Sequence, residues 1–163
     1  MAIACRPSLL IADEPTTALD VTTQAQILDL LRRLRAEMDM SIVLISHDLA
    51  VIAEFCDRVM VMYAGQILEE APIDSFFVRP RHPYSSALLQ ALPENQPPLR
   101  ELAVLPGSPP PLGYVPPGCR FAARCEFVEQ GRCDVAPIPL QLLGDGSVRC
   151  VRAEELVLKG ADQ

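Results

Sequence analysis

The sequence is short of glycine and lysine in a way that excludes one kind of nucleotide site. All eight glycines lie at or after Gly65, and the only lysine among the 163 residues is Lys159. A phosphate-binding loop of the form G-x-x-x-x-G-K-[ST] needs both residue types ahead of a helix, so these residues contain no such loop. Basic residues are also few, 14 against 21 acidic ones. The resulting formal charge of −7 argues against a nucleic-acid binder held by a general positive field.

Long apolar runs are lacking as well. No run approaches the roughly 18 residues that a membrane-spanning helix needs. The residues that follow Met1 are too short and wrongly flanked for a secretory signal, so the expected location is the cytoplasm. In that compartment the six cysteines favour thiols or metal ligands over disulfides. Half of the residues are hydrophobic, which is enough for one core with an appendage.

Residues 1–71 alternate apolar runs with amphipathic stretches, a pattern that predicts an α/β fold. The run 8–13 is continuously apolar until it ends in acid, as expected of a strand buried on both faces of a parallel sheet. The glycine of Ala64-Gly65 suits a hairpin turn, which would close the sheet with an antiparallel edge. The expected elements are a strand at 8–13, a helix at 21–38 capped by Asp20, Thr22 or Thr23, a strand at 41–46, a helix at 49–56, and hairpin strands at 58–63 and 66–71.

The composition changes at Pro72, so we expect one domain at 1–71 and a second at 72–163. The second begins with helices at 73–78 and 83–92. Prolines are too dense in the following stretch for regular helix or central strand, which predicts an extended linker. The expected parts of the second domain are a helical part at 72–92, a Pro-rich linker at 93–117 and a Cys-containing irregular region at 118–152.

Polar residues follow the ends of the two expected parallel strands. Asp13 and Glu14 follow the first strand, and Ser46 and His47 follow the second. Ligands of open α/β sheets bind outside the carboxyl ends of the strands. There a carboxylate at Asp13 can hold Mg²⁺, Glu14 can orient or deprotonate a water, and His47 can donate to a terminal phosphate oxygen. Each of these residues taken alone could be explained as an ordinary solvated loop residue, but their occurrence together in this order favours a functional site.

Three segments in this region resemble the ATPase subunit of an ABC transporter, a P-loop NTPase-type fold. They are Leu9-Leu-Ile-Ala-Asp13-Glu14-Pro15, Ala18-Leu19-Asp20 and Ser46-His47-Asp48. The resemblance implies that Asp13 serves Mg²⁺, that Glu14 is the catalytic base for ATP hydrolysis and that His47 contacts the γ-phosphate. It also implies that Asp20 communicates across a nucleotide-sandwiched dimer and that Ser46 lies at the nucleotide.

The family's phosphate loop, Q-loop and L-S-G-G-Q signature precede this region and do not occur in the 163 residues. The sequence therefore looks like the carboxyl-terminal part of a longer protein, through truncation, a split gene or a misread start. Positioning and charge stabilisation supply nearly all of phosphoryl-transfer catalysis, so we expect no ATP hydrolysis by the isolated chain.

The segment Arg81-His82-Pro83-Tyr84 through Leu92 reads by itself as a docking helix with Tyr84, Leu88, Leu89 and Leu92 on one face. It also resembles the segment that marks the oligopeptide, dipeptide and nickel subgroup of ABC transporter ATPases. That resemblance implies peptides or nickel as the cargo.

A set of cysteines forms the third signal. Four of them lie in the last third of the sequence, each beside an arginine, and a neighbouring cation favours thiolate over thiol. Such a set suits an iron-sulfur cluster or zinc; the alternative is reduced cysteines without metal. Resemblance to the peptide-transporter subgroup favours a 4Fe-4S cluster. Cys5 and Cys56 have apolar neighbours and are expected to pack in the core. The four candidate ligands are Cys119, Cys125, Cys133 and Cys150.

We therefore interpret the sequence as part of an ATP-binding subunit that energises peptide import from the cytoplasmic face of the inner membrane. The implied partners are a second ATPase subunit, identical or different, integral permease subunits and, indirectly, a solute-binding protein. One alternative is a non-catalytic binding or regulatory module stabilised by metal. Another is a non-transport member of the ABC superfamily, which leaves residues 81–92 and the cysteine set unexplained.

Overall fold

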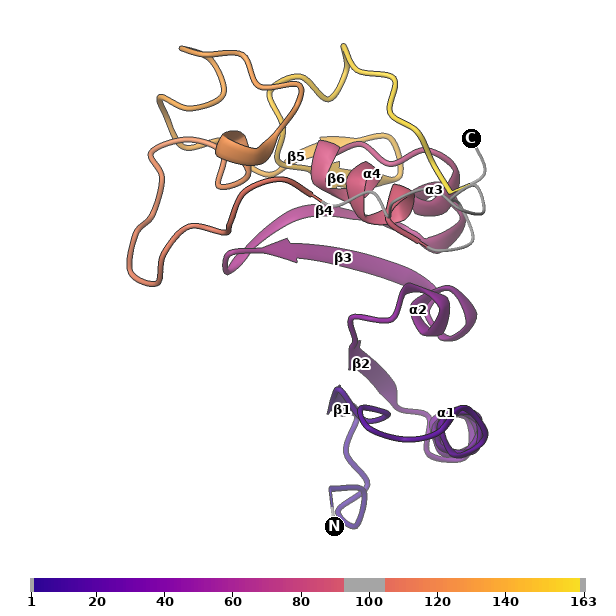
Figure 1. The fold of residues 1–163 in the computed structure, drawn as a ribbon. Helices are drawn as coiled ribbons and strands as arrows, with labels where there is room; N and C mark the ends of the chain where they lie inside the picture. The colour runs from indigo at the N-terminus through magenta and orange to yellow at the C-terminus, as the bar shows by residue number, and fades with distance from the viewer. Residues whose placement is uncertain (1, 93–104, 162–163) are drawn as a thin grey trace, which may run out of the picture. The chain divides into compact units, whose positions relative to one another are not determined.

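A computed structural model describes residues 2–92 and 105–161 of the chain. The chain divides into two compact units, Met1–Cys56 and Asp57–Gln163 (Figure 1). The division after residue 71, expected from the change in composition, stays a prediction about domain organisation. Among the described residues, no helix is both long enough and apolar enough to cross a bilayer.

The first unit is built around two parallel strands and two helices. Strands β1 (Leu9–Asp13) and β2 (Ser41–Ile45) pair in parallel. Helix α1 (Val21–Met38) begins where the Asp20 carboxylate accepts the Thr23 N–H, and α2 (Leu49–Phe55) begins at an equivalent cap, Asp48. The expected strand-helix-strand-helix order is thereby confirmed. A small core holds the unit together, formed by Leu28, Val51 and Phe55.

The expectation that β1 is buried on both faces is wrong for this structure. Ile11 is 63% exposed and Leu9 is 49% exposed, while Ala12 is buried. In the described part of the chain, β1 pairs with β2 alone. A strand with one pairing partner leaves much of its apolar surface in contact with water.

The second unit contains a four-stranded antiparallel sheet in the order β3-β4-β6-β5. Strands β3 (Arg58–Tyr63) and β4 (Gln66–Pro72) form the expected hairpin. Ala64 and Gly65 at its turn both have positive φ, 46° and 75°, as this kind of turn requires. The hairpin does not close the parallel sheet among the described residues, contrary to expectation. It starts a sheet of its own, which short strands β5 (Gln141–Leu143) and β6 (Gly146–Val148) complete.

The cysteine region is therefore more regular than its composition suggested. Strand β6 pairs with β4, with Glu69 opposite Val148 and Glu70 opposite Ser147. A Cβ at Gly146 would lie 2.2 Å from the Glu70 carbonyl oxygen, so glycine permits this approach. The pairing joins the β6 segment of the cysteine region to the hairpin strands.

Two short helices follow β4. Helix α3 spans Ile73–Val78, as expected, and α4 spans Pro83–Gln90, two residues shorter than expected. The side chains that α4 buries most deeply differ from the expected apolar stripe, because they include two serines: Pro83, Ser85, Ser86 and Leu89. A short 3-10 helix, Ala122–Arg124, lies within the cysteine region.

An aromatic core joins the hairpin, α4 and the cysteine region. Phe121 is 2% exposed, and its ring centroid lies 5.4 Å from that of Tyr63 and 5.1 Å from that of Tyr84. Leu68 is fully buried against the same cluster, and Leu105 packs on it. Residues 93–104 of the expected Pro-rich linker lie outside the described residues. Within the described part of the linker, Arg124 donates to the Pro106 carbonyl at 2.8 Å, so this stretch is bonded to the second unit.

Candidate functional site

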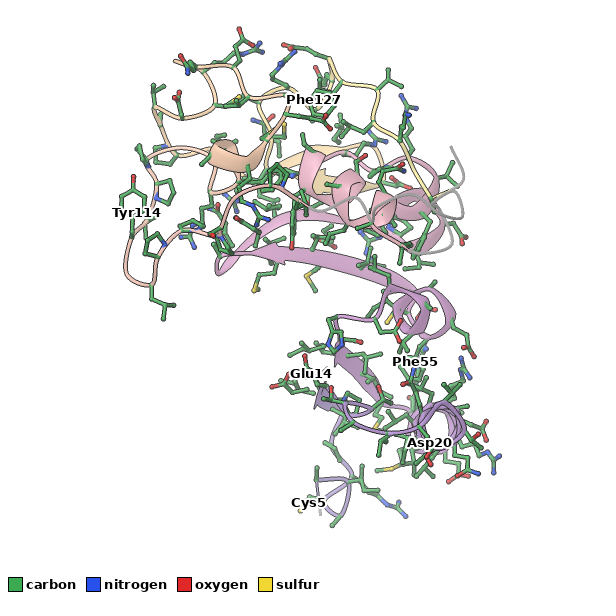
Figure 2. All side chains as sticks on the ribbon, in the orientation of Figure 1. Cys5, Glu14, Asp20, Phe55, Tyr114 and Phe127 are labelled. Carbon is green, nitrogen blue, oxygen red and sulfur yellow. The ribbon has the colours of Figure 1, made fainter. Side chains whose placement is uncertain are left out.

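The first candidate site lies at the carboxyl ends of β1 and β2. Asp13 is opposite Ile45 in the parallel pairing, and the Glu14 N–H donates to the Ile45 carbonyl at 2.9 Å. Glu14 then adopts a positive φ of 46°, which turns the chain away from the strand direction. Figure 2 labels Glu14 at the end of this strand pair. His47 lies just after β2, at the same edge of the sheet as Glu14, so the register of the two strands sets the distance between Glu14 and His47.

The structure brings Glu14 and His47 together, as their positions in the sequence predicted. The Nδ1 of His47 lies 3.1 Å from Oε1 of Glu14, and because a carboxylate only accepts, Nδ1 is the donor. The Thr17 hydroxyl donates to Oε2 of the same carboxylate at 2.9 Å. The bonds from His47, first, and Thr17 hold the pKa of Glu14 below its ordinary value. Glu14 is consequently ionised at neutral pH and fixed in orientation at both oxygens.

The other predicted residues of this site make local contacts. Asp20 caps α1, and its carboxylate accepts from the backbone N–H and the hydroxyl of Thr23 at 3.0 and 2.7 Å. The Ser46 hydroxyl accepts the Asp48 N–H at 3.0 Å, which shapes the turn that carries His47. Asp13 is exposed at the strand end. The geometry thus assembles a carboxylate-imidazole pair with a second carboxylate beside it in the chain.

Thr17 is a contact that the sequence did not single out, and it supports a direct prediction. Thr17→Val should raise the pKa of the Glu14 carboxyl, because a donor to the charged form is lost, and His47→Ala should raise it further. Carbon-13 NMR of the Glu14 carboxyl across pH measures both shifts. Thr22→Val, one turn away at the start of α1, serves as the control. Equal titrations in the wild type and Thr17→Val would contradict the bond.

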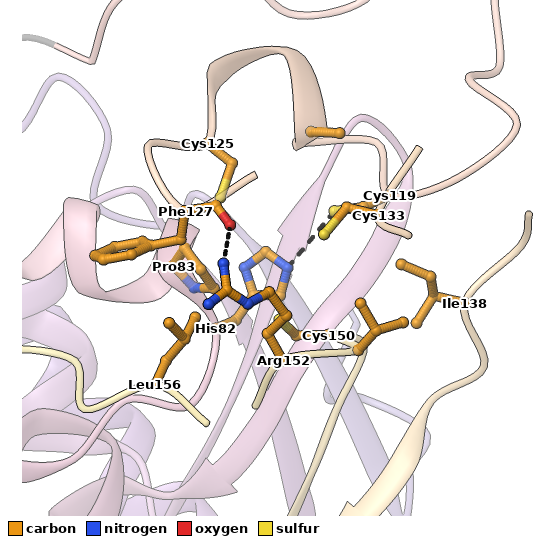
Figure 3. A pocket seen from close by; sticks show the side chains of 12 residues that line it. His82, Pro83, Cys119, Cys125, Phe127, Cys133, Ile138, Cys150, Arg152 and Leu156 are labelled. Atoms are coloured by element: carbon orange, nitrogen blue, oxygen red, sulfur yellow. Dashed lines mark hydrogen bonds between the residues drawn. The ribbon is translucent and has the colours of Figure 1, made fainter. Parts of the chain in front are cut away.

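The second candidate site is a small cavity in the cysteine region. It has a volume of about 20 Å³, roughly room for one water. The four predicted cysteines line it together with His82, which the sequence did not single out (Figure 3). All four are free thiols. Within residues 2–92 and 105–161, no three His, Cys, Asp or Glu side chains already stand in a metal-holding arrangement.

Burial sets the acidity of these thiols. It raises the pKa of Cys125 to about 11 and raises those of Cys119 and Cys150 as well. The sulfurs also receive N–H groups that favour the charged form. For three of them a donor is the backbone N–H two residues further on, in the pairs Cys119 with Phe121, Cys125 with Phe127 and Cys150 with Arg152. Cys133 accepts from the Glu129 N–H at 3.5 Å.

The arginines beside the cysteines do not act as the sequence suggested. Arg149 donates to the carbonyls of Ile67 and Ile138 at 2.9 and 2.6 Å, and Arg124 donates to those of Pro106 and Leu105. Arg120 donates to the Ala64 carbonyl. These bonds go to backbone carbonyls of neighbouring loops and not to the sulfurs. The arginine that lines the cavity is Arg152, which donates to the Phe127 carbonyl at 2.8 Å (Figure 3).

The remaining two cysteines behave differently from each other. Cys56 packs against the core of the first unit, as expected. Cys5 is exposed, so the expectation that it packs in the core is wrong. It lies in a turn ahead of β1, where apolar neighbours in the sequence do not become neighbours in space.

Comparison with known proteins relates the chain to peptide-transport proteins. Residues 68–133 match the family described as the C-terminal region of oligopeptide/dipeptide transporters. A Brucella abortus protein named for peptide import and ATP binding is 53% identical over 161 residues, covering 97% of this chain and 48% of that protein. The oligopeptide transport ATP-binding protein OppD of Haemophilus influenzae is 50% identical, covering 84% of this chain and 42% of its own length.

Among solved structures, cbiO1 of Clostridium perfringens, part of the ABC transporter complex cbiONQ, shares 32% identity over 44% of this chain and 28% of its own, with a TM-score of 0.41. The chain is thus similar in sequence to ATP-binding proteins named for peptide import and oligopeptide transport. Its residues 68–133 are similar to the C-terminal region of oligopeptide/dipeptide transporters. The chain spans about half the length of the curated relatives it matches.

Proposed function

We propose that the chain forms part of an ATP-binding subunit that energises peptide import. The observation that carries this proposal is the 3.1 Å contact between Glu14 and His47 at the carboxyl ends of paired parallel strands. The names of the related proteins, peptide import and oligopeptide transport, support peptides as the cargo. Nickel is the alternative cargo that the sequence resemblance implies.

The residues at the strand ends fit this chemistry. The ionised Glu14 carboxylate keeps lone pairs free at both oxygens and can accept the proton of an attacking water. The bonds from His47 and Thr17 hold it in one orientation, which general-base catalysis requires. Asp13 would supply an oxygen ligand to Mg²⁺, a hard cation that neutralises charge on the transferred phosphoryl group. A phosphate loop would have to come from residues beyond these 163.

The proposal includes partners and a location. A second ATP-binding subunit would complete the nucleotide site, with Asp20 and Ser46 near the interface between the two subunits. Closure of this dimer would be transmitted to integral permease subunits. A solute-binding protein would deliver the peptide. The subunit would act at the cytoplasmic face of the inner membrane as a peripheral protein.

The test is a chimera in which this chain replaces the matching residues of the Brucella abortus relative. Purified chimera should hydrolyse Mg-ATP, and cells whose own peptide-import ATP-binding subunit is deleted should regain peptide uptake. A chimera that folds and binds ATP but neither hydrolyses it nor restores uptake would favour a non-catalytic module.

We also propose that Cys119, Cys125, Cys133 and Cys150 hold a metal centre, a 4Fe-4S cluster first and zinc as the alternative. The donor chemistry fits, because four sulfurs line one cavity and each receives a backbone N–H. Buried thiols with raised pKa values resist ionisation alone, and a bound cation would offset that cost. When bound, a cluster would crosslink loops that otherwise share few regular elements. Because the cavity is small, the side chains would have to swing apart to admit a cluster.

The content of the purified protein tests the metal centre. Protein isolated without oxygen should contain iron and sulfide and show a broad visible absorbance, and Cys125→Ser should lose both. Cys5→Ser, which changes an exposed cysteine, is the matched control and should keep them. Zinc in place of iron would select the alternative metal. A colourless protein free of both metals would count against any centre here.

A further inference from the structure

We propose that His82 is a positioning residue of the cysteine site. Its Nε2–H donates a hydrogen bond to the Cys119 sulfur and so fixes the position of that sulfur. The functional role of this hydrogen bond depends on the proposed metal centre, whereas the existence of the bond does not. The Nε2 of His82 lies 3.8 Å from Sγ of Cys119, within the range of hydrogen bonds to sulfur (Figure 3). Both residues are buried, at 1% and 9% exposed.

The position of the ring proton follows from the other ring nitrogen. Nδ1 of His82 accepts the Tyr84 backbone N–H at 3.0 Å, which caps the start of α4. A backbone N–H can only donate, so Nδ1 carries no proton. A neutral ring with a bare Nδ1 must carry its proton on Nε2, the atom that faces Cys119. The cap of α4 therefore dictates that His82 donates to the sulfur.

The backbone of His82 is fixed as firmly as its ring. Its N–H donates at 2.8 Å to Oε2 of Glu69, a residue only 1% exposed on β4, and the Arg81 N–H donates at 2.7 Å to Oε1. The ring also packs 6.1 Å from that of Phe121, which lies two residues after Cys119. A continuous set of buried bonds thus runs from the sheet through His82 to the sulfur.

Donors to a cysteine sulfur stabilise its negative charge and, in an iron-sulfur centre, raise the reduction potential. Among the contacts seen at the four sulfurs, the bond from His82 comes from a side chain, while the others described above come from the backbone. A side-chain donor can be altered by substitution without changing the loop backbone. His82 is therefore the point at which the site can be adjusted and tested.

The first test needs no metal. The chain has two histidines, His47 and His82, so nitrogen-15 labelling of histidine gives two ring systems, and His47→Asn assigns them. In metal-free full-length chain, His82 should show the neutral form protonated at Nε2. Cys119→Ala should shift its Nε2 resonance more than Cys133→Ala, which changes the same cavity. A proton on Nδ1, or equal shifts in the two variants, would overturn the inference.

The second test uses a matched pair of substitutions in metal-loaded protein. His82→Asn places an amide near the ring Nδ1 position, so it can still cap α4 but cannot reach Cys119. His82→Gln places an amide near the Nε2 position and can still donate to the sulfur. The reduction potential should become more negative in His82→Asn and stay near the wild-type value in His82→Gln. The same potential in wild type and His82→Asn, or equal shifts in both variants, would overturn the role.

The two tests separate this inference from the proposals it deepens. If the wild type holds no iron, the cluster proposal fails, and the histidine NMR still decides whether His82 donates to Cys119. If the NMR shows the Nδ1–H form in a protein that does hold iron, the cluster stands and the role of His82 fails.

Discussion

Replacing Glu14 by Gln is expected to lower Mg-ATP hydrolysis by the chimera about 10²–10⁴-fold, the usual contribution of a general base. Gln has the same shape, and its amide oxygen can still accept from Nδ1 of His47. Its amide nitrogen can donate to the Thr17 hydroxyl, which then acts as acceptor, so the local geometry is kept. The amide cannot take a proton from water, however, and that step alone is removed.

The measurement is steady-state phosphate release together with ATP binding by the same preparation. Binding should be unchanged in Glu14→Gln, because the substitution alters neither the strands nor the Asp13 carboxylate beside it. Glu37→Gln, which changes an exposed carboxylate of α1, is the matched control and should hydrolyse ATP at the wild-type rate. Wild-type turnover by Glu14→Gln would assign the proton transfer to another group.

The first candidate site could be predicted from the sequence because its geometry is set by short-range rules. Glu14 and His47 each follow a strand directly, and parallel pairing brings the carboxyl ends of adjacent strands to one edge. The contact of Thr17 with Glu14 escaped the same reasoning. It depends on a turn with positive φ at Glu14 and Ala18, which spacing alone does not reveal.

For the second site, the sequence predicted the four cysteines but not the histidine and the strands that surround them. The four cysteines were found by counting, whereas His82 lies 37 residues from Cys119 and meets it only through tertiary packing. Strands β5 and β6 were also missed, because three-residue strands give too little alternation to distinguish them from loops. Their pairing with β4 depends on partners far away in the sequence. The sequence also did not predict the exposure of Ile11. A long apolar run predicts that a strand is buried, but it does not identify the residues that would cover the strand.

Removing the Glu69 side chain should cost the second unit several kcal/mol of unfolding free energy. Glu69→Ala leaves the buried N–H groups of Arg81 and His82 without acceptors, at about 1–3 kcal/mol for each. Glu70→Ala, at the next position of β4, removes a partly exposed pair with Arg58 and a 3.3 Å bond from the Ser147 hydroxyl. Among the described residues it leaves no buried backbone N–H without an acceptor, and it should cost about 1 kcal/mol or less. Urea unfolding followed by the tyrosine signal compares the two. Equal losses would mean that Glu69 does not anchor the start of α4.

The pH dependence of the same variants isolates the carboxyl group. Burial raises the pKa of Glu69 above its ordinary value of 4.5, against the opposing hydrogen bonds from the Arg81 and His82 backbone N–H groups. A raised pKa means that the folded state binds the proton more tightly than the unfolded state. The stability linked to that proton is therefore fully present below about pH 4.5 and is lost as the pH rises through the raised pKa. Glu69→Gln cannot bind that proton, so its unfolding free energy should lack this decline, while Glu70→Gln should keep it. A decline of the same size in Glu69→Gln would place the titration elsewhere and leave Glu69 as a hydrogen-bond acceptor alone.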